Sequence, residues 1–259
     1  MSPFDESAAS TQHGQEKRYF NSVLRQAFAG LNVTVGHDRI AQIADLITLA
    51  MTGSWRRYHT PEHIINLTSF NPNPIVTLAA LFHDVVYVQV DGSVHFNLTC
   101  YLSPFIKQNE SGQLVIFSQI NRSENVGFHL AMSIFGFAPA AVLSPFGGQN
   151  EFLSAIVAVG VLKDILPLVT LAKIVACIEA TIPFRNTAQS VERLCQNLNN
   201  VNQDFSLGWS DDDIGETVKI SVVLSNRDVV SFADPSPASF LDTTWDLMPE
   251  TNQALRRPG

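Results

Sequence analysis

The stretch from residue 152 to residue 184 is the longest apolar part of the chain, and it restricts the fold more than any other feature. A helix that is apolar on most of its sides has to be buried by other elements. Lys163-Asp164 and Pro167 interrupt this stretch, so it lacks the roughly 18 consecutive apolar residues that a membrane span needs. We therefore predict two buried helices here, over residues 152–166 and 168–180.

Helical periodicity continues on both sides of this stretch, whereas strand alternation and hairpin dipeptides are scarce. The pattern predicts a single all-α domain over residues 1–259, with a poorly ordered N-terminal tail at about 1–14 and a candidate insertion with short helices at 113–149. The other predicted helices cover residues 15–29, 39–51, 74–87, 95–107, 190–198 and 211–232. The helix after Thr60 is expected to begin at Pro61.

Composition limits the classes of function that the chain can have. With 46% hydrophobic and 15% charged residues, 259 residues can build a sizeable core. The net charge of -8 argues against nucleic-acid binding, but one or two arginines in a pocket suffice for a small phosphorylated substrate. The cysteines (Cys100, Cys177 and Cys195) form no CxxC motif, and residues 1–18 lack the apolar core of a signal peptide. We expect a cytoplasmic protein without membrane contact. The sequence is also compatible with a homo-oligomer.

Two short segments, residues 57–63 and 82–87, contain three of the seven histidines. The second segment ends an apolar helical run with His83-Asp84, where polar groups without partners are costly to bury. A divalent cation would offset that cost. A structural hydrogen bond between His83 and Asp84 is the alternative.

Asp228 interrupts a second apolar helix close to its buried face. A carboxylate there needs a cation or an arginine nearby, unless it lies on the solvated edge or pairs with Arg227. Mixed nitrogen and oxygen ligands fit one divalent ion of Mn, Fe, Co, Ni, Zn or Mg. The predicted metal ligands are His59, His83, Asp84 and Asp228.

The order of these residues resembles the H…HD…D signature of the HD-domain metal-dependent phosphohydrolases. Arg57-Tyr58-His59, the segment Phe82 to Tyr87 and Asn226-Arg227-Asp228 are similar to a bacterial branch of predicted HD phosphohydrolases. The resemblance implies a compact HD-type helical bundle that hydrolyses phosphate esters, often of nucleotides. Two family features differ: Tyr87-Val88 replaces the Glu-Asp pair of the alarmone hydrolases, and residues 93–97 replace an Asn-Glu pair.

The resulting hypothesis is a metal-dependent phosphohydrolase that cleaves a phosphate ester of a small metabolite, with a nucleotide favoured, through a metal-activated water. The general base stays open among His63, Glu62, Glu179 and His95. Candidate substrate contacts are Arg56, Arg57, Arg185 and His95.

Two other readings compete with this hypothesis. The first is a catalytically inactive HD-fold regulatory or protein-interaction module that retains the metal site. The second and weaker reading is a zinc-protease pair of His59 and His63. It fails because Glu62 precedes the second histidine, whereas the protease motif needs a glutamate after the first.

Overall fold

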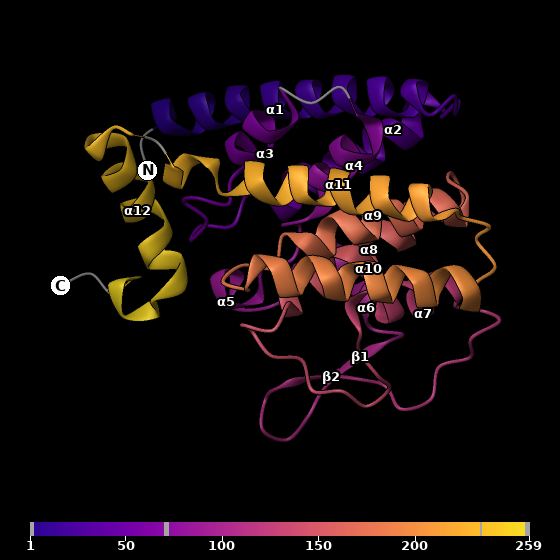
Figure 1. Cartoon of the computed structure of the whole chain (residues 1–259). Helices are drawn as coiled ribbons and strands as arrows, with labels where there is room; N and C mark the ends of the chain where they lie inside the picture. The colour runs from indigo at the N-terminus through magenta and orange to yellow at the C-terminus, as the bar shows by residue number, and fades with distance from the viewer. Residues whose placement is uncertain (1–2, 70–72, 234, 257–259) are drawn as a thin grey trace.

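The computed structural model describes residues 3–69, 73–233 and 235–256. These residues form a helical bundle with one small hairpin, which confirms the predicted all-α fold (Figure 1). The α-helices are α1 (Pro3–Gly30), α2 (His37–Ala50), α3 (Pro61–Thr68), α4 (Pro74–Phe82), α5 (Val88–Asp91), α6 (Thr99–Leu102), α7 (Val126–Phe135), α8 (Gln149–Leu162), α9 (Leu168–Ala180), α10 (Thr187–Asp204), α11 (Asp211–Asp228) and α12 (Pro237–Thr251). The remaining elements are the 3₁₀ helices η1 (Phe96–Leu98), η2 (Val230–Ala233) and η3 (Gln253–Arg256) and the strands β1 (Ile106–Gln108) and β2 (Leu114–Ile116).

Helix α9 lies in the middle of the bundle and packs against α4, α7, α8, α10 and α11. Its bounds agree with the prediction for residues 168–180, and most residues of α8 and α9 are buried. A single hydrophobic core contains side chains from α1 through α11. Among the described helices, none has the length and hydropathy that crossing a bilayer requires.

Helix α1 packs along α2, α3 and α4 at one face of the bundle. Phe20, Leu24 and Phe28 anchor it, because each is 1% exposed or less. The tail predicted for residues 1–14 is helical from Pro3 onward, and residues 1–2 lie outside the described part of the chain.

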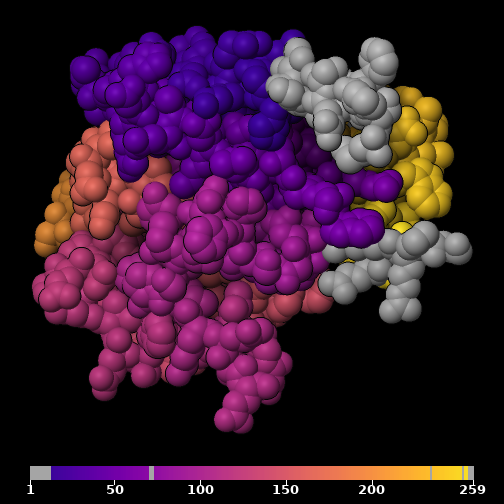
Figure 2. Space-filling model, turned by 180° about the vertical axis from the view of Figure 1, so that it is seen from behind, coloured from indigo at the N-terminus to yellow at the C-terminus, as the bar shows by residue number. Residues whose placement is uncertain are grey.

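The candidate insertion at 113–149 contributes to the core. Phe128 and Phe135 of α7 both contact the ring of Phe152 on α8, with centroids 6.1 and 5.3 Å apart. These aromatic side chains therefore fill the interior. Figures 1 and 2 show that the β1–β2 hairpin projects from the end of the bundle formed by α6 and α7.

The predicted helix over residues 95–107 is wrong. The chain forms η1 and α6, and β1 then pairs antiparallel with β2, with Lys107 opposite Val115. The side chain of Asn109 accepts hydrogen bonds from the backbone N–H groups of Ser111 and Gln113, and Gly112 adopts a positive φ of 78°. These contacts favour a turn, because the asparagine side chain accepts the N–H groups that backbone carbonyl oxygens would accept in a helix.

Helix α4 begins as local chemistry predicts but ends earlier than expected. Asn73 caps it by accepting hydrogen bonds from the N–H groups of Ile75 and Val76. The predicted helix over 74–87 is wrong at its C-terminus, because α4 ends at Phe82 and His83 is the C-cap. Asp84 consequently lies beyond the regular helix, and this placement matters for the site described below.

We expect Phe152→Ala to lower the free energy of unfolding by about 3–5 kcal/mol, because it removes a fully buried ring from an aromatic cluster. The matched control is Phe146→Ala, which alters a side chain that is 88% exposed and should change stability by less than about 0.5 kcal/mol. Urea unfolding monitored by circular dichroism measures both. Equal effects of the two substitutions would contradict the packing described here.

Candidate metal centre

Three helix ends meet at one place in the bundle. Thr60 is the N-cap of α3 and Pro61 its first residue, as predicted, which puts His63 in the first turn. His83 and Asp84 follow the end of α4, and Asp228 is the last residue of α11. The packing of α4 and α11 against α9 brings these ends together.

Four side chains converge where these helices end. One ligand atom from each of His63, His83, Asp84 and Asp228 lies within 4.8 Å of the other three. His83 Nε2 lies 2.8 Å from Asp84 Oδ2 and 3.2 Å from Asp228 Oδ1, and His63 Nε2 lies 3.0 Å from Asp228 Oδ1. Metal–ligand bonds of about 2.1 Å place neighbouring ligand atoms roughly 3–3.5 Å apart, so these separations suit one small divalent ion.

The hydrogen bonding of His83 leaves its Nε2 available as a ligand. Its Nδ1 lies 2.9 Å from the carbonyl oxygen of Ala80, so Nδ1 donates to that oxygen, and Nε2 would present its lone pair to a cation that replaces the second proton. Asp84 Oδ2 is buried and accepts no hydrogen bond from the described residues, although His83 Nε2 is close. A buried acceptor without a donor is costly, and a cation at this position would compensate it.

The pKa values of these groups show how strongly they interact. Burial tends to raise the pKa of Asp84, but the opposing effect of His83 and His59 is larger and lowers it to about 2. The pKa of Asp228 is also lowered despite burial, chiefly by His83 and His63. Burial alone would lower the pKa of His83, but Asp84 and Asp228 raise it well above its ordinary value. The site therefore favours positive charge between two carboxylates.

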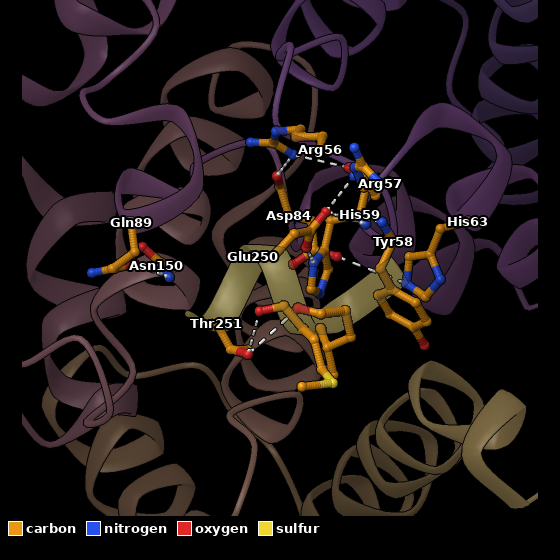
Figure 3. Close-up of polar contacts among 12 residues, drawn as sticks. Arg56, Arg57, Tyr58, His59, His63, Asp84, Gln89, Asn150, Glu250 and Thr251 are labelled. Atoms are coloured by element: carbon orange, nitrogen blue, oxygen red, sulfur yellow. Dashed lines mark hydrogen bonds and ion pairs between the residues drawn. The ribbon is translucent and has the colours of Figure 1, made fainter. Parts of the chain in front are cut away.

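His59 lies beside this group and is paired with a residue near the end of the chain. Its Nδ1 forms a short hydrogen bond with Glu250 Oε2, and its ring is 5.8 Å from that of His63. Glu250 Oε1 also accepts the backbone N–H groups of Arg57 and Tyr58 at 2.5 and 2.9 Å (Figure 3). The carboxylate of α12 thereby fixes the segment that carries His59.

The structure thus gives the two histidines of the first motif different positions from those expected. Sequence reasoning assigned His59 to the metal and His63 to proton transfer. His63 is the one whose ligand atom belongs to the four-residue group. His59 nevertheless lies close enough to the centre to help lower the pKa of Asp84.

Arg56 is buried, so it does not have the solvent access that the predicted substrate contact needs. Its Nε and Nη2 donate to Asp91 at 3.0 and 2.8 Å, and Nη1 donates to the carbonyl oxygen of Asp84 at 2.7 Å. Because these donors are occupied, the geometry gives Arg56 an orienting role for the segment after His83.

A pocket of about 410 Å³ opens beside His63 and Asp228. Arg57 and Arg227 line it, and Arg57 is exposed. Glu62 also lines this pocket and is exposed. The predicted substrate contact Arg57 and the candidate base Glu62 therefore both line the pocket next to the four-residue group.

The other candidate residues lie apart from these contacts. Glu179 and Arg185 pair with each other, since Arg185 Nη1 donates to the buried Glu179 carboxylate at 2.6 Å. Arg193 donates to the same oxygen at 3.3 Å. His95 is exposed, just before η1. Among the described residues, no hydrogen bond or ion pair joins Glu179, Arg185 or His95 to the four-residue group.

Sequence reasoning missed several residues that shape the site. Tyr58 donates its hydroxyl to the carbonyl oxygen of Asp228 at 3.0 Å, and burial raises its pKa to about 12. Asp91 and Glu250 supply the carboxylates that hold Arg56 and His59. An aromatic residue next to His59 was a usable signal for Tyr58. Nothing local distinguishes Glu250 from a surface glutamate.

Comparisons with protein-family models, with curated proteins and with solved structures gave no match.

We expect Glu250→Gln to lower the free energy of unfolding by about 1–3 kcal/mol, because it replaces a buried carboxylate that serves several donors with an amide. Urea unfolding provides the measurement. Glu110→Gln is the control, because Glu110 is exposed in the hairpin turn and should tolerate the change. Indistinguishable midpoints for the two variants would mean that Glu250 does not anchor the segment at Arg57 to His59.

Proposed function

We propose that the chain is a metal-dependent phosphohydrolase that acts on a small phosphorylated metabolite, with a nucleotide as the favoured class. The observation that carries this proposal is the convergence of His63, His83, Asp84 and Asp228, in which Asp84 Oδ2 is buried, accepts no hydrogen bond from the described residues and lies 2.8 Å from His83 Nε2. A divalent ion bound there would lower the pKa of a water molecule and polarise a phosphoryl oxygen.

The residues around the group supply the other functions that such a reaction needs. Arg57 lines the pocket and would contact the anionic phosphoryl group of a substrate. Tyr58 and Phe232, whose rings are 5.3 Å apart, form an aromatic wall next to His63. Arg56 and Asp91 hold the backbone of Asp84 in place. Preorganised groups of this kind lower the cost of orienting a substrate.

The choice of phosphate chemistry depends on the charge of the pocket and on the resemblance to HD phosphohydrolases. Arg57 and Arg227 line a pocket that also carries Glu62 and Asp246. The arginines suit an anionic phosphate, and the carboxylates suit hydroxyl or amino groups on the rest of the molecule. A nucleoside phosphate offers both kinds of group.

We expect wild-type protein to retain about one Mn²⁺ per chain and to release phosphate from at least one nucleotide or phosphate monoester. Asp84→Ala should lose both properties, with turnover falling by more than about 100-fold, since even the loss of a residue that only orients a metal ligand costs 10–100-fold. Metal analysis after gel filtration and a phosphate-release assay measure these effects. Asp164→Ala, at an exposed position after α8, is the control.

Two outcomes of this experiment would count against the proposal. Undiminished turnover in Asp84→Ala would exclude the described centre as the catalytic site. Wild-type protein that binds the metal but turns over no compound would favour the regulatory module.

We also expect the two histidines of the first motif to differ in their contribution to metal affinity. His63→Ala should weaken Co²⁺ binding by more than about 100-fold. His59→Ala should weaken it by only about 10–100-fold, as is typical of residues that lie around the metal ligands without binding the metal. Titrations followed by Co²⁺ absorption measure both affinities. A larger loss in His59→Ala would return His59 to the ligand set in place of His63.

A further inference from the structure

One carboxylate of α12 is bound by a set of donors that is typical of an anion site. Glu250 Oε1 accepts the backbone N–H groups of three consecutive residues, Arg57, Tyr58 and His59, at 2.5, 2.9 and 3.3 Å. The other oxygen, Oε2, forms the short hydrogen bond with His59 Nδ1 (Figure 3). Successive N–H groups that converge on one point make a concave anion-binding surface, or nest. These four donors form the 57–59 nest.

Contacts on the side of the bundle hold the backbone of the nest in place. Residues 57–60 form a bend, in which the N–H of Thr60 donates to the carbonyl oxygen of Tyr58 at 2.9 Å. The buried Arg56 donates through Nη1 to the carbonyl oxygens of His59 and Asp84, at 3.5 and 2.7 Å. None of these contacts involves α12. The N–H groups would therefore still converge if Glu250 left the nest.

Helix α12, in contrast, depends on the nest for its buried anchor. Glu250 is the only buried residue among those described in α12, and its side chain has no exposed surface. Leu241 and Trp245 are exposed, and the described hydrophobic core contains no residue of this helix. Figure 1 shows α12 at the edge of the bundle. An external anion that takes the place of one carboxylate would therefore release the end of the helix.

We propose that the 57–59 nest is a binding site for a phosphate group, and that Glu250 occupies it as a built-in competitor when the ligand is absent. Phosphate oxygens accept the same N–H and imidazole donors as a carboxylate, with more acceptor atoms and more charge. The exposed Arg57, which lines the adjoining pocket, adds a cationic group. This inference goes beyond the proposed hydrolysis, because anion binding at the nest requires neither turnover nor a metal ion.

The nest borders both the four-residue group and the pocket. The ring of His59 lies 5.8 Å from that of His63, and Tyr58 lines the pocket. Thr243 and Asp246 of α12 line the same pocket. A phosphate group in the nest would therefore lie beside the candidate metal ligands. The helix that fills the nest also forms part of the pocket wall, so its departure would open the pocket.

Competition for shared donors determines the direction of the expected effects. Phosphate and Glu250 exclude each other, so removal of the carboxylate should raise the apparent affinity for phosphate, because the nest is then free in every molecule. By the same linkage, phosphate should loosen α12. A ligand that orders this segment without using these donors would leave Glu250 in place.

The first test is a calorimetric titration of the full chain with inorganic phosphate in the presence of Mg²⁺. We expect Glu250→Ala to bind phosphate at least about tenfold more tightly than wild type. Glu250→Gln keeps an acceptor oxygen but loses the charge, so its affinity should be intermediate. The control, Asp242→Ala, removes an exposed carboxylate from the same helix and should match wild type within about twofold, because solvent and salt screen an exposed charge.

Two further readouts use wild-type protein, so they decide the question even if Glu250→Ala does not fold. In nitrogen-15 spectra, phosphate should shift the amide signals of Arg57, Tyr58 and His59. Chymotrypsin should cleave α12 after the exposed Trp245 faster in phosphate than in sodium chloride of equal ionic strength. Both effects should saturate at the phosphate concentration that the calorimetric affinity predicts.

A repeat of the titrations after EDTA treatment separates the nest from a metal ion, which can also bind phosphate. The gain in affinity of Glu250→Ala should persist without metal. Adenosine monophosphate, titrated in the same way, distinguishes the source of the phosphate group. A response equal to that of inorganic phosphate assigns the nest to organic phosphates, and a response to inorganic phosphate alone assigns it to the free ion.

Three results would overturn the nest as a phosphate site. The first is equal phosphate affinity in Glu250→Ala and Asp242→Ala. The second is a set of amide shifts confined to residues outside 57–59. The third is binding that disappears with EDTA and does not depend on Glu250, which would place the anion on a metal ion. None of these results bears on the proposed hydrolysis, which Asp84→Ala tests separately.

Discussion

Charge compensation between Asp84, Asp228 and His83 is the interaction on which the rest of the centre depends. Two carboxylates lie within reach of one imidazole in the interior, and Asp228 stands at the C-terminal end of α11, where the helix dipole is also unfavourable to negative charge. A neutral imidazole presenting a lone pair cannot satisfy them. The site therefore requires a proton or a cation at that point, and the helices that converge there determine how far apart its ligand atoms lie.

Arg56 connects this centre to the neighbouring part of the fold. It is buried and joins Asp91 of α5 to the carbonyl oxygen of Asp84, with Met51 Sδ as a further contact. A buried ion pair contributes little net stability by itself, because desolvation offsets the attraction. Its contacts instead fix the direction of the chain after His83. Arg56, which was expected to contact the substrate, thus binds the backbone of the candidate metal ligand Asp84 instead.

The parts of this arrangement that the sequence predicts are those encoded locally. The run 168–180 matches α9 because its periodicity and the preceding Pro167 define a helix on their own. His83, Asp84 and Asp228 could be found because polar residues interrupt apolar helices. The strands of the hairpin were missed, because two strands of three residues each are too short to show an alternating pattern. Glu250 was missed for a different reason: its partner His59 is 191 positions away, and no local pattern records that contact.

Helix α12 shows what such a distant contact implies for the site. Glu250 is the only buried residue among those described in α12, while Leu241 and Trp245 are 52% and 61% exposed. Polar contacts with the segment at Arg57 to His59, rather than apolar burial, therefore fix the end of this helix. Coupling between two sites is reciprocal, so a ligand that orders the segment Arg57 to His59 also stabilises the docked end of α12. Conversely, displacement of α12 leaves the N–H groups of that segment and His59 Nδ1 without their acceptor, Glu250.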